Sequence, residues 1–247
     1  METQSQSFVV LPGDAIDPSI IPTTKTKPLR LGPGLRHIPP SEIVPTVSGK
    51  LIVDPRKNSM WVEYNSHRYI PSQNDLIIGQ IARNAADFYY VNISPYNSNA
   101  TLPHLSFESA TKKTRPQLAP GQLIYARVTL ANKHMDAELE CVSSTTGKAE
   151  GLGPITGGMV FDISLGFARR LLMAKSKDEG GLQVLELLGE EGLAFETAVG
   201  RNGKVWVGSD SPKIVIIVGR ALKETDEGDL GVDAQKKLVK RLMRDMR

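Results

Sequence analysis

The chain has 247 residues, of which 40% are hydrophobic and 23% charged, a balance typical of a folded protein rather than a disordered one. Its length predicts two or three modules, because domains commonly contain about 100 residues or more. A single cysteine, Cys141, excludes an internal disulfide and favours a reducing compartment. No apolar run reaches the length of a membrane span and the first residues lack the basic start of a signal peptide, so we expect no membrane partner.

The formal net charge of +3 is unevenly distributed along the chain. Residues 236–247 contain six basic residues and one acidic residue, which contribute +5. Subtracting this +5 from the total of +3 leaves −2 for the remaining residues. Because the main body has no overall positive field, any contact with RNA there has to come from a local basic patch.

The first part of the chain, up to about residue 69, predicts a small β module. Short apolar segments alternate with proline and glycine, and residues 54–58 have the composition of a turn. The expected strands are Leu29–Leu35, Ile43–Val53 and Met60–Tyr64.

The next part, to about residue 142, predicts a small closed barrel of the OB type. Five short strands at this spacing are typical of that fold, which is a frequent platform for single-stranded nucleic acid. The expected strands are Asp75–Ala82, Asp87–Ile93, Ala100–Leu105, Gln122–Leu130 and Ala137–Val142.

The connection from Phe107 to Gly121 is the chemically informative part of this barrel. It carries Lys112, Lys113 and Arg115 and ends in a segment too rich in proline to extend a helix. A basic loop between barrel strands can follow RNA phosphates, and an ordinary solvated loop is the alternative. Arg83 is a further candidate for a phosphate contact, against the interpretation as a surface arginine near a strand end.

Three consecutive aromatic residues, Phe88, Tyr89 and Tyr90, lie in the second expected strand. Strand alternation places Phe88 and Tyr90 on one face and Tyr89 on the other. At least one ring is therefore expected in the core and at least one exposed for base stacking. The pattern does not assign which face is which, and Tyr89 is included among the candidate RNA-binding residues.

After a linker at residues 143–158, the pattern predicts a mixed module. A strand, two helices, two strands and a helix are expected in that order, which is the order of a KH module. The expected elements are Met159–Ile163, a helix capped by Ser164, a helix at Leu182–Leu188, a hairpin at Phe195–Val207 and a helix at Pro212–Leu222.

The hairpin contains the motif Gly200-Arg201-Asn202-Gly203. A Gly-x-x-Gly motif joins two helices and clamps the nucleic-acid backbone in KH domains. Here the flanking residues alternate as strands do, and Asn-Gly favours the positive φ angles of a tight turn. The motif therefore predicts a structural hairpin rather than an RNA clamp.

The last segment, from Val232 to Arg247, predicts an amphipathic helix with cations on one face. Such a helix can lie on RNA, a membrane surface or a partner protein. A frayed, solvated tail is the alternative.

The residues give little support to an enzyme. Histidines 37, 67, 104 and 134 lack the spacing of a metal site, and no Walker-type phosphate loop is present. Cys141 lies in an alternating strand and is expected to pack rather than react. Neighbouring carboxylates such as those of Glu190 and Glu191 point apart, so we predict no catalytic residue, metal or cofactor.

Four segments together resemble the cap subunits of the RNA exosome, a similarity that covers roughly Val9 to Leu222. They are residues 75–79, 110–116, 138–141 and 200–207, read as DLIIG, ATKKTRP, ELEC and GRNGKVWV. The resemblance implies a mainly β plus α+β chain. Its expected parts are an N-terminal β domain (1–69), an S1-type OB barrel (70–145), a KH domain (146–228) and an extra basic C-terminal helix (229–247).

The resemblance also implies a function. It implies a non-catalytic subunit of a hetero-oligomer, bound to RNase PH-like ring subunits and other cap subunits. Such a subunit helps to form the pore that guides single-stranded RNA to a separate nuclease for 3′–5′ RNA processing, including that of ribosomal RNA, and decay. The implied locations are nucleus, nucleolus and cytoplasm. A free-standing single-stranded RNA-binding factor is the alternative.

The same resemblance implies roles for particular residues. The loop with Lys112, Lys113 and Arg115 matches the pore-facing loop of the family. Gly200, Asn202, Gly203 and Trp206 belong to a structural hairpin near the contact between barrel and KH domain. The loop between the KH helices, residues 174–181, departs from an RNA clamp because its glycines are adjacent and follow two acidic residues. The KH module is therefore expected to serve packing and assembly.

Overall fold

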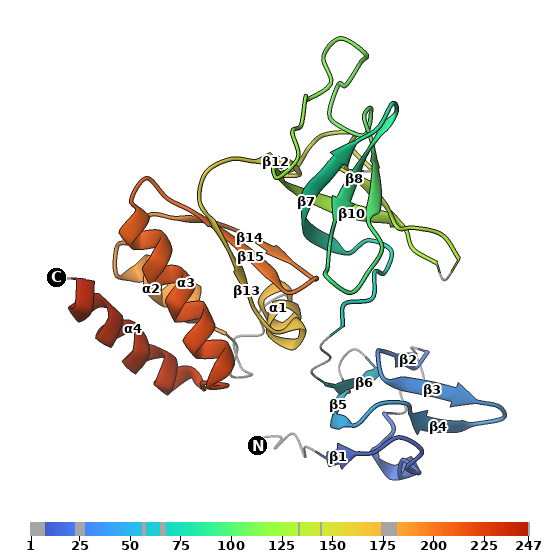
Figure 1. Cartoon of the computed structure of the whole chain (residues 1–247). Helices are drawn as coiled ribbons and strands as arrows, with labels where there is room; N and C mark the ends of the chain where they lie inside the picture. Colours follow the sequence, from blue (N-terminus) through green and yellow to red (C-terminus); the bar gives the residue numbers. More distant parts are fainter. Residues whose placement is uncertain are drawn as a thin grey trace. The chain divides into compact units, whose positions relative to one another are not determined.

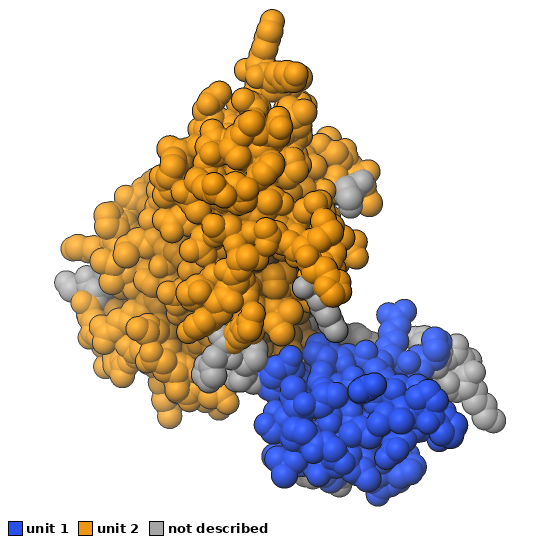
Figure 2. Space-filling view, turned by 45° about the vertical axis from the view of Figure 1, so that its right-hand side comes forward, with its two compact units in different colours: residues 1–66 blue, residues 67–247 orange. Residues whose placement is uncertain are grey.

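The computed structural model of the chain describes residues 8–22, 28–55, 58–64, 68–132, 134–143, 145–173 and 182–246. The chain divides into two compact units, residues 1–66 and residues 67–247 (Figures 1 and 2). The first unit is a small β domain, and the second contains an OB barrel and a KH fold. The finer domain boundaries expected from the sequence stay a prediction.

The first unit is built from two small sheets and a short 3-10 helix, η1 (Pro18–Ile20). A four-stranded sheet has the order β1 (Phe8–Val10), β5 (Gly49–Asp54), β6 (Ser59–Glu63) and β2 (Arg30–Leu31), and a two-stranded sheet pairs β3 (Leu35–Ile38) with β4 (Glu42–Pro45). Leu51, Met60 and Val62 are buried at its core. The domain thus closes around a few apolar side chains from the sheet.

Two strands expected in this unit are each divided in two. The segment 29–35 is interrupted at Gly32-Pro33-Gly34, where proline removes a backbone donor and Gly34 has a φ of 80°. The segment 43–53 is divided after Pro45, because the chain leaves the sheet of β4 and enters that of β5. Both corrections come from backbone turns inside an apolar run.

The second unit begins with the barrel. Its five strands are β7 (Leu76–Asn84), β8 (Phe88–Asn92), β9 (Ala100–Pro103), β10 (Leu123–Leu130) and β11 (Glu138–Glu140). The barrel is closed because β11 pairs with β9 in parallel and with β10 in antiparallel orientation. A short strand, β12 (Gly153–Ile155), adds to the outer edge of β10. The five expected strands are confirmed to within a few residues at each end.

The KH fold follows the expected order. Its elements are β13 (Met159–Asp162), α1 (Leu165–Leu172), α2 (Val184–Glu190), β14 (Glu196–Gly200), β15 (Lys204–Gly208) and α3 (Pro212–Glu227). The Ser164 Oγ accepts a hydrogen bond of 3.1 Å from the Phe167 backbone N–H and so caps α1. The three strands form one sheet in the order β13-β15-β14. Pro212 opens α3, as expected for its first turn.

The C-terminal helix α4 (Val232–Met246) packs beside α2 and α3 (Figure 1). Its side chains Leu238, Val239 and Leu242 are buried in the same apolar cluster as Leu222 of α3. The interpretation as a frayed tail is therefore wrong, and the apolar face is used inside the chain's own KH fold. The basic residues remain on the outside of α4, and Arg241 pairs with Glu224. Within the described ranges, no helix has the length and apolar character that a membrane span requires.

Candidate nucleic-acid interface

The motif Gly200–Gly203 forms the turn between β14 and β15, as predicted. Gly200 pairs with Lys204, and the Gly203 N–H donates a hydrogen bond of 3.1 Å to the Gly200 carbonyl. Within the motif, only Gly203 has a positive φ, of 76°. The expectation that the Asn-Gly pair would share this geometry is thus corrected at Asn202. Gly200 is required for space, since a Cβ there would lie 2.8 Å from the Ile78 backbone nitrogen.

The Asn202 side chain joins the KH fold to the barrel. Its Nδ2 donates hydrogen bonds to the carbonyls of Ile78 at 2.8 Å and Ile93 at 2.7 Å, and its Oδ1 accepts from the Ile78 N–H at 3.3 Å. The side chain is buried, with an exposed fraction of 8%. One amide therefore satisfies backbone groups of the barrel that are more than 100 residues away in the chain.

Three further contacts strengthen the same junction. The Arg201 N–H donates to the Leu76 carbonyl at 2.7 Å, and the Arg201 guanidinium lies 3.5 Å from the Asp75 carboxylate. The Tyr125 hydroxyl of β10 donates to the Val199 carbonyl of β14 at 3.1 Å. The hairpin thus contacts two neighbouring strands of the barrel, in agreement with the place that the family resemblance implied for it.

Trp206 of β15 is hydrogen-bonded to the linker, residues 143–158, that precedes the KH fold. Its Nε1–H donates a hydrogen bond of 2.8 Å to the Gly157 carbonyl. A Cβ at Gly158 would lie 2.6 Å from the same indole nitrogen, so the linker approaches the ring closely. These contacts fit the structural role that was expected of Trp206.

The basic connection between β9 and β10 projects from the barrel as a folded loop (Figure 1). Lys112 and Lys113 are exposed at its tip. The turn that carries them is closed by Thr111 and Thr114, whose hydroxyl oxygens are 2.8 Å apart, and by a 2.9 Å hydrogen bond from the Arg115 N–H to the Thr111 carbonyl. The two lysines are therefore displayed on a compact turn. We call residues 107–121 the basic loop.

Tyr89 lies in the barrel core, and its assignment as a base-stacking residue is corrected. Its exposed fraction is 1%, so the ring offers no face to a base. Its hydroxyl donates a 2.7 Å hydrogen bond to the Pro116 carbonyl and accepts one of 3.3 Å from the Leu118 N–H. Tyr89 therefore contacts the base of the basic loop from inside the barrel.

Arg115 is held at the same base by His104. The guanidinium Nη1 contacts His104 Nδ1, and His104 Nε2 lies 2.9 Å from the Asn84 Oδ1. His104 has an exposed fraction of 3%. Burial, together with the positive charge of Arg115, lowers the pKa of the imidazole below its ordinary value. Arg115 is thus half-buried and partnered, unlike the two lysines at the tip.

Arg83 lies within β7 and stacks on Tyr90, which in turn contacts Phe88. Its guanidinium carbon is 3.7 Å from the centroid of the Tyr90 ring, and Phe88 meets Tyr90 edge to face at 5.0 Å between centroids. A β-bulge shifts the pairing register between Ile81 and Arg83. Alternation correctly grouped Phe88 with Tyr90, but no glycine or proline signalled the bulge that brings Arg83 opposite Tyr90.

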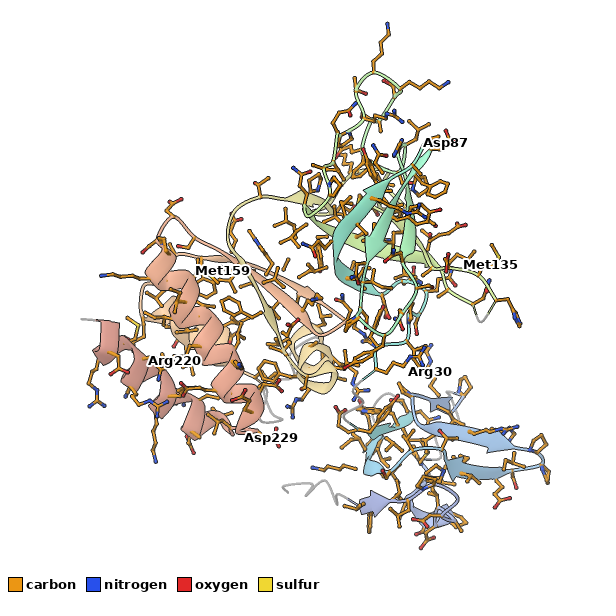
Figure 3. The ribbon with its side chains drawn as sticks, in the orientation of Figure 1. Arg30, Asp87, Met135, Met159, Arg220 and Asp229 are labelled. Atoms are coloured by element: carbon orange, nitrogen blue, oxygen red, sulfur yellow. The ribbon has the colours of Figure 1, made fainter. Side chains whose placement is uncertain are left out.

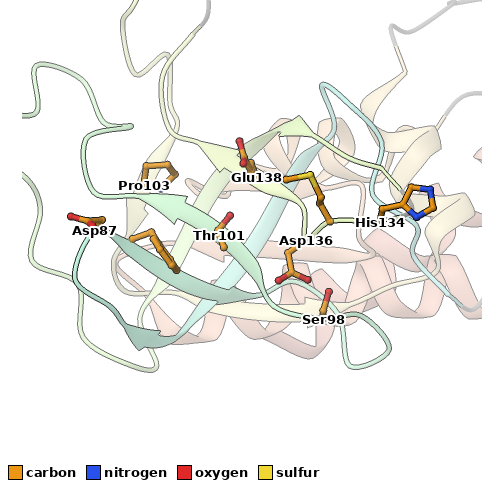
Figure 4. A pocket seen from close by; sticks show the side chains of 9 residues that line it. Asp87, Ser98, Thr101, Pro103, His134, Asp136 and Glu138 are labelled. Atoms are coloured by element: carbon orange, nitrogen blue, oxygen red, sulfur yellow. The ribbon is translucent and has the colours of Figure 1, made fainter.

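An open groove of about 850 Å³ lies on a flank of the barrel (Figures 3 and 4). Its lining residues are Asp87, Phe88, Ser98, Thr101, Pro103, His134, Met135, Asp136 and Glu138. Three of them are carboxylates, which repel phosphate. The groove was not anticipated from the sequence, and its charge makes it a poor continuation of the basic loop for RNA.

Three other candidates from the sequence are the thiol of Cys141, a metal site and the loop between the KH helices. Cys141 is buried, its thiol faces the Tyr125 carbonyl at 3.7 Å, and burial with the nearby Glu140 raises its pKa to about 12. The thiol is therefore packed and protonated, as expected. Within the described ranges, no group of three or more His, Cys, Asp or Glu side chains could hold a metal ion. The expected departure from an RNA clamp at residues 174–181 lies outside the described residues.

A closed OB barrel locked to a KH fold, with a basic loop on the barrel, defines the class of S1/KH RNA-binding proteins. Three family models match in succession: the Rrp40 N-terminal domain of an exosome complex exonuclease over residues 29–68, the S1 domain of exosome complex component RRP40 over 69–153, and a KH domain over 158–213. The chain belongs to the exosome complex component RRP40 family, which confirms the resemblance to exosome cap subunits.

Relatives from distant eukaryotes support this assignment. The chain is 39% identical to exosome complex component RRP40 of Saccharomyces cerevisiae over 206 residues, covering 81% of each. It is 38% identical to the Drosophila melanogaster protein, covering 90% of each, and 32% identical to the Homo sapiens protein, covering 85% of this chain and 74% of the relative. A solved structure described as an exosome complex RNA-binding protein aligns with a TM-score of 0.55 at 26% identity, over 72% of this chain and 96% of its own.

Proposed function

We propose that this chain is a non-catalytic cap subunit of the RNA exosome. In this role it stabilises the ring of RNase PH-like subunits together with other cap subunits, and it guides single-stranded RNA into the pore for 3′–5′ processing and decay. The relatives that match it over most of their length are named as exosome components. The observation that carries the RNA-guiding role is the exposed Lys112–Lys113 turn on the barrel.

The barrel carries exposed cations that can contact a polyanion. Lys112 and Lys113 supply two solvated cations on the basic loop, and Arg115 lies at its base in contact with His104. Arg83, stacked on Tyr90, adds a cation next to an aromatic face. Cations follow the phosphates, while an aromatic ring can stack a base without selecting its sequence. This combination suits the threading of many different RNAs.

The non-catalytic part of the proposal is supported by how the barrel uses its polar side chains. The hydroxyl of Tyr89 and the amide of Asn202 are buried and hydrogen-bonded to backbone groups. The imidazole of His104 is likewise paired on both ring nitrogens. These groups hold loops and strands together, and nuclease activity is left to a separate subunit.

The test is a charge reversal at the loop tip in the reconstituted exosome. We expect the double variant Lys112→Glu/Lys113→Glu to assemble normally but to crosslink less to a single-stranded RNA carrying photoreactive bases. The control is Lys236→Glu/Lys237→Glu on the exposed face of α4, which makes the same change in charge away from the barrel. Unchanged crosslinking in the loop variant, or an equal loss in the control, would contradict the assignment.

The alternative, a free-standing single-stranded RNA-binding factor, predicts a different purification. A tagged chain recovered from nuclease-treated extract should then lose every partner, whereas the exosome proposal predicts a fixed set of RNase PH-like subunits. We also propose that the protein is present in the nucleus, the nucleolus and the cytoplasm. Fluorescence imaging of the tagged chain at its natural level tests that distribution.

A further inference from the structure

A buried hydroxyl, that of Tyr89, holds the basic loop to the barrel. Tyr89 is the second residue of β8, and its neighbours across the sheet are Leu102 of β9 and Asn84 of β7. Its ring is therefore held on both sides by paired strands. The hydroxyl at the end of this ring both donates to the Pro116 carbonyl and accepts from the Leu118 N–H. A rigid sheet residue thus fixes the chain immediately after the lysine turn.

A second tie runs through His104 to Arg115. An arginine guanidinium can only donate hydrogen bonds, so the His104 Nδ1 in contact with it has to be the accepting nitrogen. The proton of the neutral ring is then on Nε2, which donates to the Asn84 Oδ1 at 2.9 Å. Asn84 ends β7, so this chain of contacts connects Arg115 to a second barrel strand.

Both contacts hold residues that directly follow the lysine turn in the chain. The backbone N–H of Arg115 donates to the Thr111 carbonyl at 2.9 Å, which closes the turn between these residues. Lys112 and Lys113 are the first two residues inside that turn. Whatever fixes Arg115 and Pro116 therefore also fixes the direction in which the lysine turn leaves the barrel.

We propose that Tyr89 and His104 are positioning residues that hold the Lys112–Lys113 turn in place for RNA, and that Arg115 serves in this anchor rather than as a direct RNA ligand. The inference rests on the RNA-guiding role proposed above. Cations held in a fixed place bind with a smaller loss of conformational freedom than cations on a loose loop. The buried hydroxyl and imidazole thereby act on RNA without touching it.

The first test removes the hydroxyl group of Tyr89. In the full chain, Tyr89→Phe keeps the aromatic ring and removes both hydrogen bonds to the loop. Because each of these bonds has a typical net strength, their loss should raise the rate of tryptic cleavage after Lys112 and Lys113 at least about fivefold. In the reconstituted exosome, crosslinking of the loop to photoreactive single-stranded RNA should fall while assembly is unchanged.

The matched control is Tyr125→Phe. This variant also removes a partly buried hydroxyl-to-carbonyl hydrogen bond from the same barrel, the one to Val199 at 3.1 Å, but it lies away from the basic loop. It should lower overall stability to a similar degree and leave both loop cleavage and loop crosslinking at the wild-type level. An equal effect of both variants would show a general loss of stability and would overturn the positioning role.

A charge-conserving variant distinguishes the two possible roles of Arg115, which are to anchor the loop and to bind RNA directly. Arg115→Lys keeps a cation for phosphate but cannot reproduce the guanidinium contact with His104. We expect it to increase loop cleavage and to reduce RNA crosslinking, as Tyr89→Phe does. Wild-type cleavage and crosslinking in both variants would overturn the inference, and so would faster cleavage with unchanged crosslinking. Failure of the RNA-guiding role itself would appear separately, in the charge-reversed lysine variant.

Discussion

At the scale of single residues, the polar side chains buried in the second unit act mainly as connectors. Asn202 pairs with the backbone of Ile78 in β7 and of Ile93 just after β8, and Tyr89 pairs with the base of the basic loop. A buried polar group is stable only when its hydrogen bonds are satisfied, so each connector fixes both of the segments that it joins. The geometry of the candidate RNA surface therefore depends on residues that are buried beneath it.

Asn202→Ala should be among the most destabilising single changes at the junction. It removes the donors from the carbonyls of Ile78 and Ile93, and we expect it to lower the free energy of unfolding by about 2–4 kcal/mol. Urea unfolding of the full chain measures this loss. Asn132→Ala is the control, because Asn132 accepts two hydrogen bonds from an exposed loop where water can replace it, and its cost should stay below about 1 kcal/mol.

The stability of the loop anchor should depend on pH through His104. Burial and the adjacent Arg115 lower the pKa of this imidazole from 6.5, outweighing the opposite effect of Asp87. Below pH 6.5 the unfolded chain therefore binds this proton more readily than the folded chain does. The contribution of neutral His104 is complete above pH 6.5 and is lost as the pH falls toward the lowered folded-state pKa.

This dependence can be measured by difference. The stability advantage of the wild-type chain over His104→Gln, followed by urea unfolding, should shrink between pH 7 and pH 5. His134→Gln provides the control, since His134 is exposed in the loop before β11. An advantage over His104→Gln that stays constant or grows on acidification would contradict the depressed pKa.

At the scale of elements, alternation and turn chemistry predicted most of the fold. The five barrel strands and the order of the KH elements follow from periodicity, because each strand or helix buries one face. Periodicity failed where the backbone departs from regular geometry. The split of residues 29–35 at Gly34 and the bulge before Arg83 change the direction of the chain without changing its apolar content.

The candidate site was predicted only in part for a related reason. The cluster at Lys112, Lys113 and Arg115 is visible in the sequence because charges near each other in the chain lie near each other in space. Alternation could not tell whether Tyr89 faced inward, since both faces of β8 carry aromatic rings. The link between Arg115 and His104 joins positions whose relation depends on how the loop folds back.

Helix α4 should behave as part of the KH core rather than as an appendage. Leu242 is 1% exposed, so Leu242→Ala should cost about 3 kcal/mol of folding free energy in the full chain. Lys240→Ala, on the solvated face of the same helix, should change stability by no more than about 0.5 kcal/mol. Thermal unfolding compares the two, and equal effects would contradict the packing of α4.

At the scale of the whole molecule, the 30 lysine and arginine residues are spread along the chain, and only the net excess of positive charge is local. The residues before 236 sum to −2, three carboxylates line the groove beside β9 and β11, and the exposed cations among the described residues of the barrel include Arg83, Lys112 and Lys113. Local fields of this kind direct a polyanion to one path instead of attracting it everywhere. That is the behaviour required of a subunit that passes RNA onward rather than retaining it.

The junction at Asn202 also bears on how the protein is made. The carbonyls of Ile78 and Ile93 receive their side-chain partner from a residue translated more than 100 positions later. During synthesis the barrel sequence therefore leaves the ribosome well before its last hydrogen bonds can form. A barrel excised from the chain would leave the carbonyls of Ile78 and Ile93 without this partner and open to water. Folding of the barrel is therefore completed only when the hairpin of the KH fold has been synthesised.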